Sequence, residues 1–284
     1  MAGSANAQTP EDTIAAVKAY AAEVNAALEA QSMDFRLSQA DILFGADTGQ
    51  ESITVIFEDR GNKQLSTQFA EGDTRRAWSG TDPDTIDWTL DGVDLTADTG
   101  AQEQVGAIAS AMGTWDSQKC SDLGLSGQIA GFDQGYVQAI VGSGGGFFVT
   151  GDIMFSGFLS QSGFMGPNTL GVHFGFNFID LATGEPSDIN GDGYADKAFG
   201  DIYFNDDFPW SVDGSAVDIE TVALHEAGHG LSQDHFGKGF VTKKGKLQFS
   251  PRAVMNATYF GIERDLKGTD KGGHCSLWGA WPNN

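Results

Sequence analysis

Residues 222–235 hold three histidines and one glutamate at a spacing that suits a metal centre. His225 and His229 are four positions apart, so on a helix both imidazoles lie on one face and can bind one ion. Glu226 is offset by one position, which puts its carboxylate beside the ion. A catalytic zinc ion takes three protein ligands and keeps a fourth position open for water, and His235 supplies the third ligand if the chain turns back after the helix. The segment therefore predicts a catalytic Zn²⁺ site with Glu226 as the general base.

Residues 188–196 carry oxygen-bearing side chains at alternating positions around a glycine. Ca²⁺ requires hard oxygen ligands in such a loop, and we predict a structural Ca²⁺ site here. Phe199 stands where an EF-hand loop has its last glutamate, so the segment looks more like the short calcium loops of dockerins and integrin propeller blades. An ordinary turn rich in Asp, Asn and Gly is the alternative. The predicted ligands are the side chains of Asp188, Asn190, Asp192 and Asp196 and the backbone carbonyl of Tyr194.

The chain of 284 residues is strongly acidic, with 39 Asp and Glu against 16 Lys and Arg and a formal net charge of −23. This charge argues against nucleic acid and anionic membranes as partners. Eight of the basic residues, with only three acidic ones, lie between Lys238 and Lys271. No run of residues is long and apolar enough to predict a membrane span.

The start of the chain and its two cysteines predict a secreted protein. Ala5-Asn6-Ala7 looks like the end of a signal peptide. In an extracellular protein, two cysteines are more often a disulfide than two free thiols. We therefore expect a bond between Cys120 and Cys275.

The pattern along the chain predicts an N-terminal region ahead of a larger domain. Proline and two acidic residues follow Thr9, which is typical of a helix start, and the alanine-rich run predicts one helix up to Ala30. The polar stretch from Ala77 to Pro83 marks a boundary, so we divide the chain into residues 1–80 and 81–284. The strands expected in the first part, joined as a hairpin, are Ser52–Phe57 and Gln64–Phe69.

The second part alternates between strand and helix patterns, and its Phe-rich runs separated by glycines suit a mixed sheet. One expected helix places four apolar side chains on a single face, and these are Val105, Ile108, Met112 and Trp115. The expected helices are Ala101–Lys119 and Ser215–Leu231. The expected strands are Thr85–Leu90, Tyr136–Val141, Phe147–Phe155, Leu170–Leu181 and Gly200–Asn205.

The zinc segment resembles the long motif of the metzincin peptidases, H-E-x-x-H-x-x-x-x-x-H, and the matrixin branch is the most similar. Residues typical of matrixins stand in register with the histidines, and they are Gly228, Leu231 and Asp234. Downstream, Ala253-Val254-Met255-Asn256 is similar to the Met-turn of this family, in which the methionine lies under the zinc. Asp270–Gly279 is similar to the closing helix, so the resemblance covers about Thr85 to Gly279.

The resemblance implies an α+β metzincin-type domain with a mixed twisted sheet over two helices. A protein or peptide substrate would lie extended along the edge strand near Leu170–Phe176. Ser232 stands where the family has glycine, and the positive φ expected there costs a serine about 1 kcal/mol. Tyr203 replaces a ligand of the structural zinc of matrixins, so we expect that second zinc to be absent. The loop between His235 and Met255 is longer than in matrixins and carries Lys243, Lys244 and Lys246.

Two functions follow as alternatives: a secreted zinc endopeptidase, or a non-catalytic Ca²⁺-dependent binding module on a metzincin fold. Glu226 favours the enzyme, because a module has no need of a carboxylate beside the metal. Residues 1–80 are either a pro-segment or a permanent accessory domain. Phe69 to Asp73 is similar to the aspartate switch of astacins, in which Asp73 would cap the zinc. The sequence defines neither the cleavage specificity nor the oligomeric state.

Overall fold

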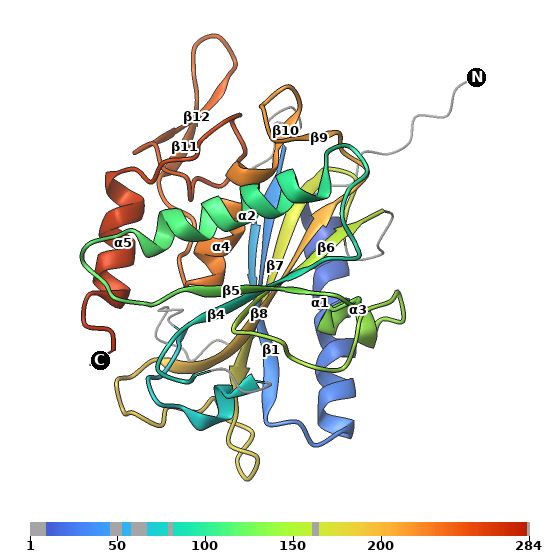
Figure 1. The fold of residues 1–284 in the computed structure, drawn as a ribbon, viewed down its shortest axis with the longest axis vertical. Coiled ribbons are helices and arrows are strands. Elements are labelled where there is room, and N and C mark those ends of the chain that lie inside the picture. The colour runs from blue at the N-terminus through green and yellow to red at the C-terminus, as the bar shows by residue number, and fades with distance from the viewer. Residues whose placement is uncertain (1–9, 46–52, 58–66, 79–81, 161–164, 283–284) are drawn as a thin grey trace.

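The computed structural model describes residues 10–45, 53–57, 67–78, 82–160 and 165–282. Its centre is one twisted sheet in the order β2-β1-β7-β8-β6-β4-β5, and β3 pairs with β8 outside this path (Figure 1). Strands β8, β6, β4 and β5 are parallel to one another. The other three are antiparallel to their neighbours: β7 to β8, β1 to β7 and β2 to β1. The strands are β1 (Phe35–Phe44), β2 (Ile53–Ile56), β3 (Thr67–Gln68), β4 (Asp87–Asp91), β5 (Ser126–Ala130), β6 (Ile153–Leu159), β7 (Thr169–Phe178) and β8 (Ala195–Asn205).

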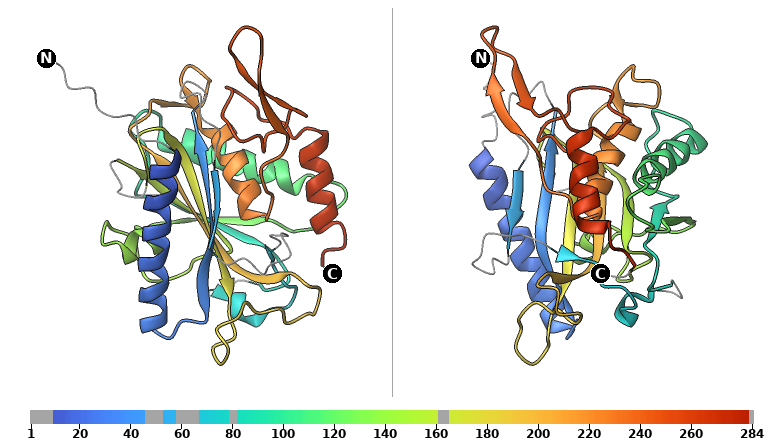
Figure 2. Two further views of the ribbon diagram at one scale, coloured as in Figure 1. Left: turned by 180° about the vertical axis from the view of Figure 1, so that it is seen from behind. Right: turned by 90° about the vertical axis from the view of Figure 1, so that its left-hand side faces the viewer.

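Helices cover both faces of this sheet. Figure 2 shows α1 on one face and α2 and α4 on the other. The helices are α1 (Pro10–Ala30), α2 (Ala101–Asp116), α3 (Tyr136–Ile140), α4 (Ile219–Gly230) and α5 (Gly268–Trp278), with a 3₁₀ turn, η2, at Thr74–Arg76. Two small two-stranded sheets are formed by β9 (Trp210–Ser211) with β10 (Val217–Asp218) and by β11 (Lys238–Val241) with β12 (Leu247–Ser250).

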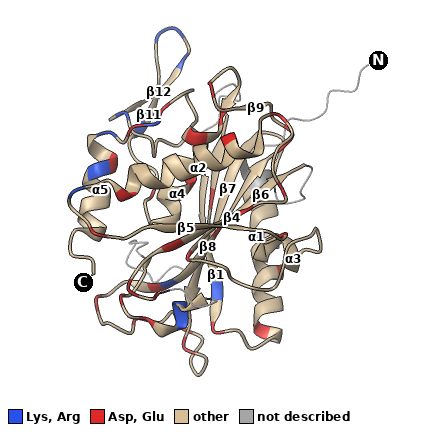
Figure 3. Ribbon diagram, viewed as in Figure 1, with Lys and Arg blue, Asp and Glu red and all other residues tan. Residues whose placement is uncertain are grey.

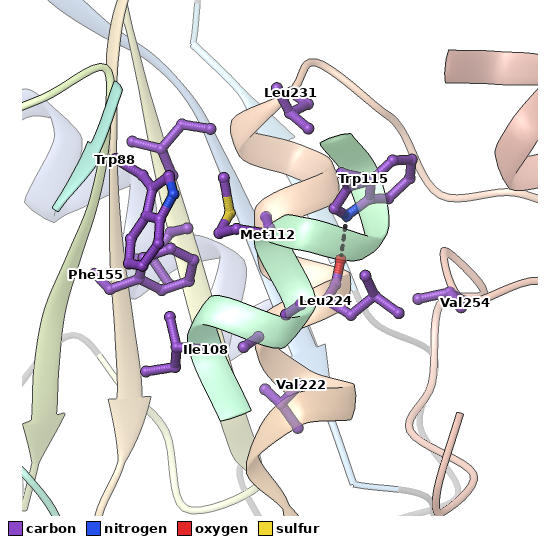
Figure 4. Close-up of a cluster of buried hydrophobic side chains, with 14 of the residues drawn as sticks. Trp88, Ile108, Met112, Trp115, Phe155, Val222, Leu224, Leu231 and Val254 are labelled. Atoms are coloured by element: carbon purple, nitrogen blue, oxygen red, sulfur yellow. Dashed lines mark hydrogen bonds between the residues drawn. The ribbon is translucent and has the colours of Figure 1, made fainter. Parts of the chain in front are cut away.

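The face that carries α2, α4 and α5 holds one hydrophobic core, here named the α4 core (Figure 4). Trp115 of α2 is fully buried, and its indole Nε1 donates to the carbonyl of Leu224 in α4 at 2.9 Å. Ile108 and Met112 are buried beside it and Val105 is partly buried, as the predicted apolar face requires. Burying each large apolar side chain contributes about 1.5–3 kcal/mol, so this packing fixes the position of α4.

The opposite face holds a second hydrophobic core, here named the α1 core, in which α1 packs on β1 and β2. Proline is well placed at the first position of α1, because an N–H there would have no helical partner. Buried residues of α1 recur at helical spacing, and they are Val17, Ala21, Val24 and Leu28. After Ala30, Ser32 adopts a φ of 54°, and Met33 N–H returns to the carbonyl of Leu28 at 3.0 Å. The N-terminal region is thus packed on the sheet.

Most predicted elements are confirmed. The helices predicted at 9–30, 101–119 and 215–231 are α1, α2 and α4, and the predicted closing helix is α5. The strands predicted at 85–90, 170–181 and 200–205 are β4, β7 and β8. A mixed sheet with helices agrees with the predicted α+β class.

Two predicted strands in the second part are wrong. Tyr136–Val141 forms the short helix α3, because the N–H groups of Tyr136 and Val137 both donate to the buried carboxylate of Asp201, at 2.9 and 3.0 Å. A carboxylate at this end of a helix satisfies N–H groups that have no partner within the helix. The strand predicted at Phe147–Phe155 begins only at Ile153, since the preceding residues follow an irregular course.

The predicted N-terminal hairpin is also wrong. Ile53–Ile56 pairs with β1, and Thr67–Gln68 pairs with β8. The sequence pattern missed β1, because Phe35–Phe44 is buried along almost its whole length and its alternation of apolar and polar residues slips at Ser38–Gln39, where the pairing with β7 shifts register. The predicted turn at residues 59–62 lies outside the described residues.

The Cys120–Cys275 disulfide is confirmed, with the two Cα atoms 5.5 Å apart. It joins the chain after α2 to α5. Within the described ranges, no helix has the length and hydropathy needed to cross a membrane. The division of the chain near residue 80 stays a prediction, and strands from both sides of it share the central sheet.

The long loop predicted between the third histidine and Met255 contains the hairpin β11–β12, which projects from the body of the protein (Figure 3). Its turn is closed by a hydrogen bond from the N–H of Thr242 to the carbonyl of Lys246 at 2.8 Å. The lysines of this turn, Lys243, Lys244 and Lys246, are exposed.

Candidate metal centre

Helix α4 carries the first two predicted ligands on its buried side. The helix begins where the Asp218 side chain accepts from the N–H of Thr221 at 3.0 Å, a normal N-cap. At its other end, the ammonium group of Lys197 donates to the carbonyls of His229 and Gly230 at 2.9 and 2.7 Å. Both ends of α4 are therefore held by specific polar contacts.

The chain leaves α4 through Ser232, whose φ of 62° confirms the predicted left-handed position. The N–H of Gln233 then bonds to the carbonyl of Gly228 at 2.8 Å, which closes the turn. Beyond it, the N–H of Phe236 donates to the carbonyl of Met255 at 2.7 Å. These contacts bring His235 back toward the helix.

The three histidines meet at one point. His225 Nε2 lies 3.1 Å from His229 Nε2 and 3.2 Å from His235 Nε2, and the three residues form a group that could hold an ion. Tetrahedral zinc with Zn–N bonds of about 2.0–2.1 Å places two ligand nitrogens about 3.3 Å apart. The arrangement therefore fits the predicted Zn²⁺ site.

Backbone contacts orient two of these rings. His225 Nδ1 lies 2.9 Å from the carbonyl of Val254, and His229 Nδ1 lies 2.7 Å from the carbonyl of Gln233. A carbonyl can only accept, so each Nδ1 carries the proton and each Nε2 lone pair is free for a metal. Burial lowers the pKa of both histidines, and it lowers the pKa of His235 to about 3. Neutral rings with converging lone pairs are a suitable donor set for Zn²⁺.

Glu226 lies beside this group. Its side chain is completely buried, and neither carboxylate oxygen has a hydrogen-bond partner among the described residues. Burial raises its pKa well above the usual value, and the charge of Asp41 adds to the effect. A Cβ placed on Gly171 of β7 would lie only 2.8 Å from Glu226 Oε1, so the glycine makes room for the carboxylate. Burying a carboxyl group without hydrogen-bond partners lowers the stability of the fold. Such groups are typical of catalytic sites.

Met255 packs against α4, and its role as the methionine of a Met-turn stays a prediction. It is fully buried, and a Cβ added to Gly228 would lie 2.3 Å from its sulfur. The N–H groups of Val254 and Met255 donate to the carboxylate of Asp270 in α5 at 2.9 and 3.1 Å. Close packing of the methionine explains why position 228 requires glycine.

The N-terminal strands add two polar side chains that the sequence patterns did not identify. Asp41 Oδ2 of β1 lies 3.0 Å from His173 Nδ1 and 3.7 Å from His229 Nδ1. Thr54 Oγ1 of β2 donates to Asp41 at 2.7 Å and lies 3.3 Å from His235 Nδ1. Asp41 is the one acid among the polar residues of β1, and this was the available signal for it. Burial alone would raise its pKa, but the neighbouring imidazoles lower it below the usual value.

Part of the chain is similar in sequence to a known protein. No protein-family model matches the chain. Karilysin from Tannerella forsythia is 35% identical to it over 71 residues. That segment is 25% of this chain and 12% of karilysin, so the chain covers only a small part of this relative.

The predicted aspartate switch is wrong. The carboxylate of Asp73 accepts from the Arg75 guanidinium at 2.7 to 3.1 Å and from the Arg75 backbone N–H at 3.0 Å. It caps the 3₁₀ turn η2 and does not belong to the histidine group. Asp41 is the N-terminal acid that lies next to these histidines.

The predicted calcium loop is only partly assembled. Asp196 is buried and accepts from Arg75 Nη2 at 2.7 Å, whereas Asp188 accepts from the N–H groups of Gly191 and Gly193 at 2.9 and 3.1 Å. The side chains of Asn190 and Asp192 bond to each other at 2.8 Å. Ca²⁺ binding at residues 188–196, with Tyr194 as a backbone ligand, stays a prediction.

Three carboxylates outside this loop lie close together, and they belong to Asp91, Asp94 and Asp133.

Proposed function

We propose that this protein is a secreted zinc-dependent endopeptidase of the metzincin type. The observation that carries the proposal is the convergence of three imidazoles, His225, His229 and His235, beside the buried carboxyl of Glu226, which has no hydrogen-bond partner among the described residues. The similarity to karilysin, a metalloprotease, supports the same class of activity. The disulfide supports an extracellular location, because such bonds persist in oxidising compartments.

In this proposal the three histidines hold the metal and Glu226 moves the proton. Zn²⁺ on three imidazoles supplies Lewis acidity, which lowers the pKa of water toward about 7 and polarises a scissile carbonyl. Glu226 accepts the proton of the attacking water and then delivers it to the leaving amine. Met255 supports the ligands from below as a Met-turn.

A non-catalytic binding module is the alternative function. Such a module gains nothing from Glu226, whose buried carboxyl without partners costs about 1–3 kcal/mol of stability. Replacing it would stabilise the fold without loss of metal binding. The presence of Glu226 therefore favours the enzyme, with Ca²⁺ as a further structural ion at residues 188–196.

The proposed function is tested by removing the metal ion from the protein and then adding it back. The full-length protein is assayed on a mixed peptide library, and new peptide ends are identified by mass spectrometry. Cleavage should stop with a zinc-selective chelator in the presence of Ca²⁺, and it should return with added Zn²⁺ but not with Mg²⁺. Cleavage that continues in the chelator after zinc has been removed, or a purified protein whose site takes up no zinc, would contradict the proposal.

A further inference from the structure

The hairpin β11–β12 is anchored directly beside the metal centre. Its first residue, Lys238, lies three positions after the predicted ligand His235. The two ends of the hairpin are held together by the side chain of Asn256, which is 1% exposed. Its amide nitrogen donates to the carbonyl of Phe236 at 2.9 Å and to the carbonyl of Pro251 at 3.1 Å. The start of the hairpin is thus tied to the segment that carries Met255.

Strand β12 also rests on the segment that follows Met255. Phe249 of this strand is buried, and its ring centroid lies 5.9 Å from that of Phe260. The guanidinium of Arg252 lies 4.5 Å from the centroid of the same ring and pairs with Glu263 at 2.7 Å. These contacts fix the base of the hairpin relative to the three histidines. Three residues span at most about 10 Å of chain, so a protein bound at the metal centre comes within reach of the hairpin.

The hairpin differs in charge from the rest of the molecule. No acidic residue occurs between Phe236 and Ile262, whereas the whole chain has a formal net charge of −23. An acidic partner is repelled by the body of the protein and attracted by the hairpin, so it is oriented toward this surface. Figure 3 shows the basic residues on the projecting hairpin, and the exposed lysines are Lys238, Lys243, Lys244 and Lys246.

Two large apolar side chains are exposed between these lysines. Phe240 is 47% exposed and Val241 is 69% exposed. Within the described part of the chain, β11 and β12 pair only with each other, so one edge of each strand is open. Lysines alone would discourage pairing at such an edge. Exposed apolar side chains beside an open edge instead favour a bound segment, because extended peptides bind by adding a strand and placing side chains against such residues.

We propose that the hairpin β11–β12 is a second substrate-binding surface, which takes an extended acidic segment of a protein substrate. The carboxylates of the segment pair with the lysines, and its apolar residues pack on Phe240 and Val241. This inference rests on the proposed peptidase function and names its substrate class, proteins with an acidic and apolar stretch near the scissile bond. A hairpin whose lysines only offset the acidic body would bind acidic and neutral segments alike.

Binding is measured first, in the absence of turnover. The zinc-loaded Glu226→Ala variant is titrated with a short fluorescent peptide in which glutamate alternates with valine. The matched peptide carries glutamine in place of each glutamate. The dissociation constant for the acidic peptide should be at least about fivefold lower, and the difference should shrink at high salt, because exposed ion pairs are weak and screened. Equal affinities for the two peptides would overturn the inference.

A charge reversal then identifies the surface that binds the acidic peptide. The hairpin variant is Lys243→Glu/Lys244→Glu/Lys246→Glu in the Glu226→Ala background. It should bind the acidic peptide at least about tenfold more weakly, because three attractive pairs are replaced by repulsive ones.

The matched control reverses three exposed lysines outside the hairpin, which lie in α1, after α2 and in α5. This control variant is Lys18→Glu/Lys119→Glu/Lys271→Glu, and it has the same net charge as the hairpin variant. It should keep the affinity for the acidic peptide. An equal loss of affinity in both variants would show a general effect of net charge and would overturn the inference.

Two other occupants of the hairpin are outcomes of the same comparison. Each variant is sedimented with phosphatidylserine vesicles, and its oligomeric state is measured by analytical ultracentrifugation. The hairpin variant could lose vesicle binding or change its oligomeric state while its affinity for the acidic peptide is unchanged. The surface would then belong to a membrane or to a second copy of the chain, and the inference would be wrong.

Hydrolysis separates this inference from the proposed function. The acidic and the neutral segment are each joined, on either side, to a peptide core that the library experiment shows to be cleaved. With Glu226 intact, the hairpin variant should raise the KM for the acidic substrates at least about fivefold more than the KM for the neutral ones. The same KM ratio in the hairpin variant and the wild type would overturn the inference and leave the peptidase intact. If the zinc-loaded protein cleaves no library peptide but still binds the acidic peptide, the proposed function is wrong and the binding surface remains.

Discussion

Helix α4 and the N-terminal strand β1 reach the candidate metal centre in different ways. On the α4 side, the predicted ligands lie within eleven residues of one another, and a helix and one turn bring them together. In the N-terminal region, formed by α1, β1 and β2, strand β1 reaches the centre only by pairing with a strand more than a hundred residues away, as the contact between Asp41 and His173 shows. The ligands are thus brought together by local spacing, whereas the N-terminal side chains reach them through long-range pairing.

The two sides also differ in how firmly they are held. The α4 side has the disulfide between α2 and α5 and a Trp115 hydrogen bond inside its core. β1 is held by strand pairing and by its share of the α1 core. The N-terminal region thus relies on noncovalent contacts, and the following variants test this contrast.

The largest effect is expected from a ligand substitution with a matched control. His229→Ala should remove zinc and lower peptide hydrolysis by about a thousandfold or more, because the metal contributes several kcal/mol. His173→Ala alters another buried histidine that stacks 6.1 Å away but lies outside the histidine group. It should keep zinc in metal analysis. Loss of zinc from both variants alike would show that burial, and not ligation, explains the first result.

The disulfide should stabilise the α4 side substantially. Cys120 and Cys275 are 155 residues apart, and the loop-closure model gives about 4–5 kcal/mol for such a bond. Cys120→Ser/Cys275→Ser should lower the free energy of unfolding in urea by up to this amount. A loss below about 1 kcal/mol would mean that packing alone holds the two ends together.

Lowering the pH should reduce the free energy of unfolding through His274 of α5, which belongs to the same region. This side chain is fully buried, lies 2.7 Å from Ser121 Oγ and stacks on Trp115, and burial lowers its pKa to about 4 from 6.5. The unfolded chain therefore takes up the proton first, so the stabilisation is present above about pH 6.5 and is lost as the pH falls toward 4. The loss is at most about 1.4 kcal/mol per pH unit, on the order of 3 kcal/mol in all.

His274→Gln isolates this contribution, because the other titrating groups remain the same in both proteins. Urea unfolding at pH 7, 5.5 and 4 should show a shallower acid loss in the variant than in the wild type. Parallel pH profiles for the two proteins would exclude His274 as the cause.

The smallest expected effects come from two serines, one just after α1 and one just after α4. Ser32 ends α1 with a φ of 54° and Ser232 ends α4 with a φ of 62°. Glycine relieves such strain, so Ser32→Gly and Ser232→Gly should each raise the free energy of unfolding by about 0.5–1 kcal/mol. Thermal unfolding measures both, and zinc content should not change. A destabilised Ser232→Gly would indicate that the serine hydroxyl has a role in the turn.

Local patterns predicted the ligand helix, the turn at Ser232 and the disulfide, because each depends on a spacing or a residue type that can be recognised in isolation. They failed where a distant partner decides the structure. Tyr136–Val141 reads as a strand by composition, yet the buried carboxylate of Asp201 makes it a helix. β1 was missed because both its faces are buried and its alternation slips at Ser38–Gln39, and its contacts with the metal centre could not be foreseen from a single acid in the strand.

The central claim is that Glu226 performs proton transfer beside a metal held by three histidines. The most direct measurement compares zinc content and peptide hydrolysis in Glu226→Ala and in Glu220→Ala, a change of another acid in the same helix, which pairs with Arg264 at 3.2 Å. Glu226→Ala should keep its zinc and lose roughly a hundredfold to ten-thousandfold in rate, while Glu220→Ala keeps both. Hydrolysis by zinc-loaded Glu226→Ala at close to the wild-type rate would contradict the account.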